Sequence, residues 1–489
     1  MEEAERQLKG VQQPLWLMRL EQEHENLRIA LKWFIERREA KYALRFSGGM
    51  WWFWRLHGYW SEGRRWLEAA LKLSQGNELG MLRAKALCAA GDLAYYQDDY
   101  LLVRALLEQS ILLYRALGAG KELAFALGTL GRVLLVQGDL ITANLLQEEG
   151  EKLCRELNSN WELSYLLRQF SEYAARAGKL KQAMAYAQES LELVQMLGDK
   201  SLMATVLSTL GNITSRQGDL AQAKAFNRES LALARELGDK PLIALALNNI
   251  EYFTALQGEI AQTENVLEAL SMTREIGDKM YITKTLHSIG YIMARQGNLA
   301  QAKKWYRESL TLAQEIQSER NIGEALCGLA LIAVTEEQFL LAALLFGAGE
   351  ARFDIDVNMN VAEQLELKQA MEKVSTLVGV KAFEEARSQG RTMTVEQVLA
   401  ASRTTAIINP LPSPRYPDDL TEGEVQFLCL AAKGLTDEQI AEQLMIAPHD
   451  VNMYLPSIYS KIKVSPDAAG DAITLRIAAT QYAIEHDLC

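Results

Sequence analysis

The chain has 489 residues, of which 49% are hydrophobic, and it carries a formal net charge of −12. This length accommodates several domains or one long repeat array, and the apolar content is enough to form a core. The negative charge disfavours a general polyanion-binding protein, because neutralising phosphates requires a surplus of Lys and Arg on the contact surface. The five Cys are scattered without metal-ligand spacing, so we expect reduced thiols in a cytoplasmic protein. The acidic N-terminus is unlike a signal peptide, and no apolar stretch is long enough to span a bilayer.

Tryptophan is concentrated near the N-terminus. Five of the nine Trp lie in one segment, GGMWWFWRLHGYWSEGRRWLEAAL, which starts at Gly48. Terminal repeats of a solenoid need special caps, so we interpret these aromatic side chains as core, with a ligand cage as the alternative. We assign residues 1–75 to an N-terminal helical cap that includes the first hairpin.

A motif of about 40 residues recurs through the middle of the chain. Examples are VQGDLITA from Val136 and RQGDLAQA from Arg216, and the glycines of five copies are spaced 40, 40, 40 and 39 residues apart: Gly138, Gly178, Gly218, Gly258 and Gly297. Each half of the repeat has apolar residues at helical spacing, and a Gly-Asp or Gly-Lys turn ends one helix and caps the next. Small residues recur inside the second helix and should allow close helix packing: Ala143, Ala183, Ala223, Thr263 and Ala302.

These features predict an all-α solenoid of helical hairpins. Only two Pro precede residue 409, which is compatible with a long helical region. A single helical hairpin cannot bury both of its faces, so the repeats are expected to stack. We assign the repeats to residues 76–345 and a C-terminal helical cap of the solenoid to residues 346–402.

The segment VLSTLGNITSRQGDLAQA, Val206–Ala223, resembles the tetratricopeptide repeat, in a variant with 40 rather than the usual ~34 residues. An unrelated helical-hairpin repeat such as HEAT is the alternative. The resemblance implies that the first helix of each hairpin lines a concave groove that binds a protein or peptide. Matching the family motif places nine candidate binding residues in this groove: Arg132, Arg168, Glu172, Ser208, Asn212, Asn248, Tyr252, His287 and Tyr291. An unoccupied, solvated groove is the other interpretation.

The segments that flank the repeats carry a wider resemblance. Arg19–Leu71 and Ala325–Phe353 are similar to the regions around the repeats in large bacterial signal-transduction ATPases related to the maltose-regulon activator. In those proteins an ATPase precedes the repeats. Here no phosphate-binding Gly-x4-Gly-Lys-Ser/Thr motif occurs, and GAGKE at Gly118 lacks its first glycine and its hydroxyl. We therefore expect a sensor and output half without its ATPase, or part of a longer chain.

Proline marks the next boundary. Four Pro in the eleven residues Asn409–Asp419 predict a stiff, extended linker, which we assign to residues 403–419. The sequence that follows, LTEGEVQFLCLAAKGLTDEQIAEQL from Leu420, resembles the LuxR-type helix-turn-helix, which implies a small four-helix domain over residues 420–489. The matching positions are mostly apolar or turn-forming, so they indicate the fold and not its function.

The positions that read DNA in that family differ here. The expected phosphate- and base-contacting residues are replaced by Ala447, Asp450, Asn452 and Tyr454, and Pro456 interrupts the helix. Residues 418–489 contain 12 acidic and 4 basic residues, a net charge of −8. We expect a degenerate recognition helix that has lost ordinary duplex binding, although Asn452 could still pair with adenine. Its candidate residues are His449, Asp450, Asn452, Met453, Tyr454, Ser457 and Lys461.

The sequence contains no recognisable catalytic or metal-binding motif. The five His are far apart, and neither Gly-x-Ser-x-Gly nor His-Glu-x-x-His occurs, so we predict no enzyme, no cofactor and no metal. We predict a signal-sensing, protein-binding relative of LuxR-type regulators, in which the solenoid binds an effector or protein and the C-terminal domain is the output. That domain is expected either to bind DNA weakly, as a dimer or with a partner that supplies charge, or to bind none. The alternative is an adaptor for a neighbouring enzyme or defence effector, in which the C-terminal domain makes protein contacts only.

Overall fold

The computed structural model describes two compact units, residues 1–399 and 400–489, which are considered separately below. Helices account for the regular structure of the described residues, and no strand occurs among them, so the predicted all-α class is confirmed. The described residues are 2–74, 79–97, 99–353, 355, 359–404, 418, 420, 422–433, 435, 437–444, 458, 461, 481, 482 and 486.

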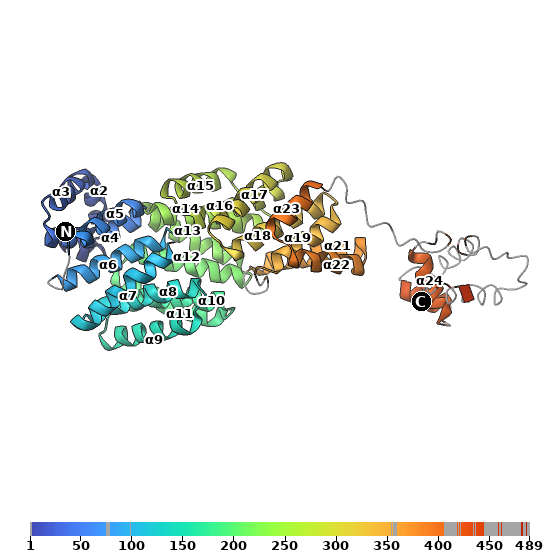
Figure 1. The fold of residues 1–489 in the computed structure, drawn as a ribbon, viewed down its shortest axis with the longest axis horizontal. Helices are drawn as coiled ribbons and strands as arrows, with labels where there is room; N and C mark the ends of the chain where they lie inside the picture. The colour runs from blue at the N-terminus through green and yellow to red at the C-terminus, as the bar shows by residue number, and fades with distance from the viewer. Residues whose placement is uncertain are drawn as a thin grey trace, which may run out of the picture. The chain divides into compact units, whose positions relative to one another are not determined.

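The first unit is a stack of helical hairpins, coloured from blue to orange in Figure 1. Three helices precede the stack: α1 (Glu2–Gln7), α2 (Gln13–Gln22) and α3 (His24–Glu36). The hairpins are α4 (Ala40–His57) with α5 (Trp60–Leu73), α6 (Gly80–Tyr95) with α7 (Tyr100–Leu117), α8 (Gly120–Val136) with α9 (Leu140–Glu156), α10 (Asn160–Arg176) with α11 (Leu180–Leu197), α12 (Lys200–Arg216) with α13 (Leu220–Leu237), α14 (Lys240–Leu256) with α15 (Thr263–Ile276), α16 (Lys279–Arg295) with α17 (Leu299–Glu315), and α18 (Glu319–Thr335) with α19 (Phe339–Glu350). Three helices follow the stack: α21 (Val361–Val378), α22 (Val380–Thr392) and α23 (Val395–Thr404).

The repeated turn motif ends and starts these helices as its residue types predict. At the turn between α12 and α13, Gly218 has a φ of +94°, a left-handed conformation that glycine adopts at little cost. The side chain of Asp219 then accepts a hydrogen bond from the Gln222 amide at 2.9 Å and so caps α13. Asp139, Asp199, Asp239, Asp278 and Asn298 cap other helices of the stack in the same way.

Small side chains inside the hairpins allow the close packing that was expected. Ala143, Ala183, Ala223 and Ala302 are fully buried. In four hairpins a buried serine of the second helix adds a polar contact, because its hydroxyl donates to a carbonyl 26 residues earlier in the first helix. The serines are Ser110, Ser190, Ser230 and Ser309, with donor–acceptor distances of 2.7–2.9 Å. These bonds satisfy polar groups that burial would otherwise leave without partners.

The N-terminal aromatic side chains are core, as interpreted from the sequence. Trp52, Trp54 and Trp60 are at most 2% exposed. Helices α1 to α5 also reach hairpins that lie far away in the sequence, because α2 contacts α13 and α4 contacts α14. Gln13 donates to Asp199 at 3.0 Å and accepts from the Ser201 amide at 2.9 Å. The N-terminal helices therefore span several hairpins and do more than close one end of the stack.

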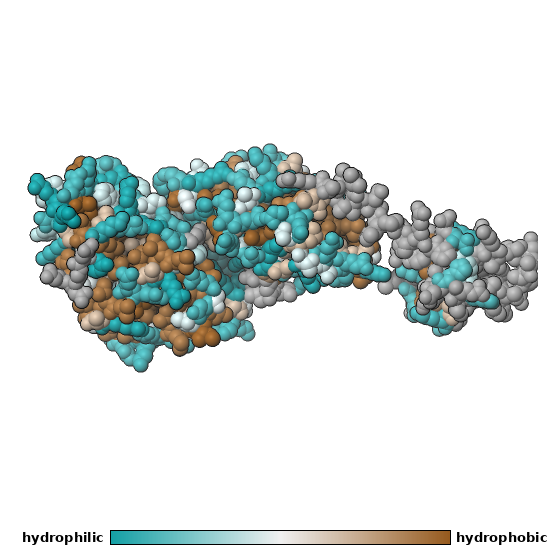
Figure 2. Space-filling view, in the orientation of Figure 1, coloured by the Kyte–Doolittle hydropathy of each residue, from teal (hydrophilic) through white to brown (hydrophobic). Residues whose placement is uncertain are grey.

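The outer surface of the stack is partly apolar. Leu101 in α7 and Ile141 and Leu145 in α9 are 81%, 77% and 61% exposed. Figure 2 shows hydrophobic residues over this part of the first unit, interspersed with hydrophilic ones. Within the described ranges, none of the helices combines the length and the hydropathy that crossing a bilayer requires.

The second unit contains α24 (Glu422–Ala432) and α25 (Asp437–Leu444) in its described part. Apolar side chains from both helices form a small core together with Leu420 and Ile458: Val425, Phe427, Leu428, Ala431, Ile440 and Ala441. Cys429 in α24 forms a disulfide, so the expectation of reduced thiols is wrong for this residue. Cys88, Cys154 and Cys327 in the first unit are free and buried.

Candidate functional site

The first helices of the hairpins form one continuous face of the stack. Consecutive members of the series α6, α8, α10, α12, α14, α16 and α18 contact one another. A row of helices in mutual contact lies on the inside of a curved solenoid, so we call their common surface the inner face. All nine groove residues expected from the sequence lie on these helices, from Arg132 on α8 to Tyr291 on α16.

Near the N-terminal end of the inner face, Arg132 is buried in an ion-pair cluster. Its guanidinium lies 3.1 Å from Asp92 Oδ1 and 3.6 Å from the ring centroid of Tyr95. Arg55 of α4 reaches the other carboxylate oxygen of Asp92 at 3.3 Å. Burial alone would lower the pKa of Arg132, but the surrounding tyrosines and Asp92 hold it well above its ordinary value. Arg132 is therefore engaged within the fold.

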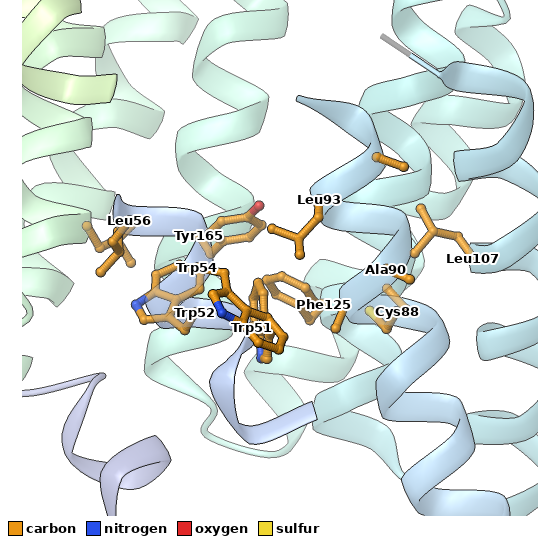
Figure 3. Close-up of a cluster of buried hydrophobic side chains, with 14 of the residues drawn as sticks. Trp51, Trp52, Trp54, Leu56, Cys88, Ala90, Leu93, Leu107, Phe125 and Tyr165 are labelled. Atoms are coloured by element: carbon orange, nitrogen blue, oxygen red, sulfur yellow. The ribbon is translucent and has the colours of Figure 1, made fainter. Parts of the chain in front are cut away.

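Helix α4 covers this end of the inner face. Trp52 packs edge-on against Trp161 of α10, with ring centroids 5.3 Å apart, and Trp51 packs against Phe125 of α8 at 5.5 Å. Figure 3 shows Trp51 and Trp52 clustered with Phe125 and Tyr165. The aromatic side chains that the sequence places near the N-terminus therefore pack on the surface that would otherwise form the first part of the groove.

The middle of the inner face is more open. Arg168 is buried and donates to Glu172 at 2.6 Å, whereas the Glu172 side chain is 40% exposed. Burial tends to raise the pKa of Glu172, but the charges of Arg168 and Arg176 outweigh it and lower that pKa below its ordinary value. Asn212 is exposed and accepts a hydrogen bond from Asn249 at 3.3 Å. Two other expected groove residues, Ser208 and Asn248, are buried.

At the C-terminal end, α21 contacts the inner face through two glutamates. The Tyr252 hydroxyl of α14 donates to Glu363. The Tyr291 hydroxyl of α16 donates to Glu366 at 2.9 Å, and Arg295 approaches the same carboxylate at 3.0 Å. Two expected groove residues, Tyr252 and Tyr291, therefore form hydrogen bonds with a helix of the same chain.

A small, partly open pocket lies between α16, α18 and α21. Its polar lining includes His287, Tyr291, Glu324 and Glu363. Burial raises the pKa of Glu363 to about 7, and the nearby charge of Glu324 acts in the same direction. Burial also lowers the pKa of His287, against the opposing effect of Glu324, so this imidazole is held neutral near pH 7.

Four cations on the inner face were not among the residues expected from the sequence: Arg176, Arg216, Lys284 and Arg320. A signal for some of them exists in the repeat itself. Arg176 and Arg216 each stand two residues before the glycine of the turn, as does Arg295. In the sequence these arginines belong to the recurring turn motif. In the structure they are the last residues of α10, α12 and α16, at the end of each inner-face helix.

The expected recognition helix in the second unit falls almost entirely outside the described residues. This applies to His449, Asp450, Asn452, Met453, Tyr454 and Ser457. The exception is Lys461, whose ammonium lies 2.7 Å from Glu424, a buried carboxylate of α24. One of the 4 basic residues in 418–489 is therefore neutralised by an internal ion pair.

Protein-family models match three segments of the chain. Residues 162–236 and 283–316 match models of the tetratricopeptide repeat. Residues 418–469 match the model of bacterial regulatory proteins of the luxR family. No curated protein matches the chain.

Solved structures resemble the chain at low sequence identity. A Rap protein complexed with competence and sporulation factor is 13% identical, with 75% of this chain and 99% of that chain covered and a TM-score of 0.45. The Rap conjugation gene regulator of plasmid pLS20, complexed with the Phr* peptide, is 15% identical over 57% of this chain and 78% of that one, with a TM-score of 0.46. A signal-transduction ATPase with a tetratricopeptide-repeat sensor from Pyrococcus horikoshii is 13% identical over 67% and 55%, with a TM-score of 0.38.

The helices of the structure and the segments matched by the family models agree on where the repeats and the C-terminal segment lie. Hairpins α10 to α13 and helices α16 and α17 fall within the matched repeats, and α24 and α25 fall within the matched C-terminal segment. This combination is that of a regulator-like protein that binds other proteins. The chain thus contains segments that match the tetratricopeptide repeat, followed by a C-terminal segment that matches the luxR family of bacterial regulatory proteins.

Proposed function

We propose that this is a non-catalytic signal-sensing protein whose solenoid binds a peptide segment of an effector or partner protein on its inner face. The observation that carries the proposal is the open middle of that face. Helix α4 covers one end and α21 contacts the other, while Glu172 and Asn212 between them remain accessible. Polar and charged side chains in such a position can satisfy the hydrogen bonds of a bound peptide backbone.

The peptide site can be tested by selecting binders to the full chain from a random peptide library. We expect the enriched peptides to lose binding to the Asn212→Trp variant, because a large side chain at this exposed position obstructs the middle of the inner face. Lys181→Trp is the matched control, since Lys181 is exposed on α11, a second helix of a hairpin. Peptides that bind both variants equally well would place the binding surface elsewhere and refute the proposal.

The second unit acts, in this proposal, as an output domain that transmits the signal by protein contact. Its net charge of −8 over residues 418–489 supports protein contact over DNA contact, because a duplex-binding surface needs cations to replace the counterions of the phosphates. The pairing of Lys461 with Glu424 removes one of the few cations that could serve this purpose.

A working DNA-binding regulator is the competing proposal, and the luxR-family match favours it. Fluorescence anisotropy of the full chain with random duplex DNA, at low and at physiological salt, separates the two. Binding that weakens steeply with salt would demonstrate phosphate contacts and support the regulator. Absence of binding at low salt would support an adaptor whose C-terminal unit contacts proteins.

A further inference from the structure

We propose that Arg176, Arg216 and Lys284 form a binding site for an acidic peptide segment on the inner face. The proposal rests on the function proposed above and specifies the chemistry of the peptide. The three residues come from three first helices, α10, α12 and α16, so a ligand that contacts all of them must lie along the solenoid. A peptide with several spaced carboxylates meets this requirement.

The three cations have no carboxylate partner among the described residues. Arg216 donates to the Ala175 carbonyl at 2.6 Å, a neutral acceptor that leaves its charge unbalanced. The Lys284 ammonium lies 5.3 Å from the ring centroid of Tyr281, a cation–π contact that also leaves the charge unpaired. Arg176 is exposed, and no carboxylate of the described chain lies within ion-pair distance of it. A bound anion would supply the missing partner.

Arg176 is close enough to repel both of the other cations. Burial, followed by the charges of Arg320 and Arg176, lowers the pKa of Lys284 to about 8. Burial and the same two arginines lower the pKa of Arg216 to about 10. Groups that share their largest electrostatic neighbours occupy one region of the molecule. This repulsion is relieved when an anion enters, so binding an acidic group stabilises the charged form of Lys284.

The chain itself shows how this solenoid holds a carboxylate. Glu366 of α21 accepts from the Tyr291 hydroxyl at 2.9 Å and from Arg295 at 3.0 Å on the same inner face. Arg295 occupies the same position of the repeat as Arg176 and Arg216, two residues before the turn glycine. An acidic peptide would extend this arrangement to the preceding repeats.

Carboxylates fit the site better than dense phosphate charge. Glu172 and Glu324 stand among the cations, and a polyphosphate lying across the site would be repelled by both. Carboxylates that are spaced along a peptide can be directed to the cations and away from these glutamates. The net charge of −12 of the whole chain also limits non-specific attraction of an acidic peptide, so any binding must come from a local site.

The test uses the full chain and a fluorescein-labelled peptide of alternating Glu and Ala, measured by fluorescence anisotropy at low ionic strength. A peptide of alternating Gln and Ala serves as the ligand control. We expect the Glu peptide to bind and the Gln peptide to bind at least roughly tenfold more weakly, since charge-assisted hydrogen bonds are lost. Equal binding of the two peptides, or binding of neither, would overturn the proposal.

Two double variants locate the site. Arg216→Gln/Lys284→Gln removes two of the proposed contacts and should weaken the Glu peptide roughly tenfold or more. Lys181→Gln/Arg228→Gln removes the same charge from exposed positions on α11 and α13 and should leave binding unchanged. Circular dichroism and thermal unfolding of each variant confirm that the fold is intact. An equal loss in both double variants would indicate net-charge attraction and overturn the site.

A pH series provides a readout that a structural role would not affect. The charge of Lys284 is present below its pKa of about 8 and is lost above it, so binding should weaken between pH 7 and pH 9. Lys284→Arg should remove this weakening. The charged or titratable groups that act on Lys284 are Arg176, Glu172, Asp278, Tyr281, Arg320 and Glu324. Binding that is independent of pH in the unmodified chain would exclude Lys284 from the site.

Two outcomes separate this inference from the function on which it rests. If inorganic tripolyphosphate binds at the three cations and the Glu peptide does not, the site takes phosphate and the acidic-peptide proposal fails. If library selection enriches neutral or basic peptides that Asn212→Trp excludes, peptide binding on the inner face stands, and only the assignment to acidic segments fails.

Discussion

At the N-terminal end of the inner face, α4 packs through tryptophans, whereas at the C-terminal end α21 makes contact through glutamates. Trp52 and Trp51 bury aromatic rings against Trp161 and Phe125. Glu363 and Glu366 instead accept hydrogen bonds from tyrosine hydroxyls and a guanidinium. The first contact depends on removing apolar surface from water, and the second depends on the charge state of single groups.

This difference implies different roles for the two helices. Burial of large aromatic rings adds to the free energy of unfolding, and this contribution changes little with pH or salt. Helix α4 should therefore be a permanent part of the stack. Hydrogen bonds to partly exposed carboxylates contribute less and respond to protonation, so α21 should be the more easily displaced covering. The four predictions below test this contrast, from the largest expected effect to the smallest.

Trp52→Ala should have the largest effect on the free energy of unfolding. The side chain is 2% exposed and joins α4 to α10, so its removal leaves a cavity that costs about 3–5 kcal/mol. Thermal unfolding by circular dichroism measures the loss. Trp33→Ala is the matched control, because Trp33 is 50% exposed and its removal should cost about 1 kcal/mol or less. Equal losses in the two variants would contradict a core role for α4.

Asp92→Ala should also destabilise the N-terminal end strongly. This carboxylate is fully buried between Arg55 and Arg132, and its removal leaves two buried guanidinium groups without an anion. Losing one member of a buried charge cluster costs about 3 kcal/mol or more. Chemical denaturation provides the measurement, with Asp139→Ala, an exposed helix cap, as the control. A loss no greater than that of the control would show that solvent screens the cluster.

The attachment of α21 should weaken as pH rises. The pKa of Glu363 is about 7 in the folded chain and 4.5 ordinarily, so the folded state binds the proton more tightly. The stabilisation is fully present below about pH 4.5 and is lost as pH rises through about 7. Hydrogen exchange of Val361–Val378 between pH 5 and pH 8, corrected for intrinsic rates, should show this trend.

The control for this pH dependence is Glu363→Gln, which should flatten it. Burial also raises the pKa of Asp239 to about 7, so Asp239 makes the stability of the chain fall over the same pH range. The difference between the unmodified chain and the variant isolates the contribution of Glu363. A slope that persists unchanged in Glu363→Gln would assign the pH response to another group.

Tyr291→Phe should have the smallest effect. The substitution removes a hydroxyl that donates to Glu366 and accepts from Arg295, and a loss of about 1 kcal/mol is expected, confined to α21. Tyr281→Phe is the matched control, since the Tyr281 hydroxyl has no hydrogen-bond partner among the described residues. Hydrogen exchange resolved by segment distinguishes the two. Deprotection that extends to α4 in Tyr291→Phe would contradict the separation of the two ends.

Much of the repeat could be predicted because its determinants are local. A turn glycine with positive φ, such as Gly218, and a capping side chain such as Asp219 act within a few residues. The family motif likewise placed the candidate binding residues on the inner face, because the position of a residue within a helix decides which face it occupies. The charged site of Arg176, Arg216 and Lys284 was missed, since two of these residues were seen as part of the turn.

The sequence by itself determined the helical class, the period of the hairpins, their caps and the row of residues on the inner face, because each depends on residues that are close in the chain. Only the tertiary structure decided which of those residues are covered. The bond between Gln13 and Asp199 and that between Tyr252 and Glu363 join segments 186 and 111 residues apart. Such contacts arise from the accumulated curvature of many stacked hairpins, which no single repeat encodes.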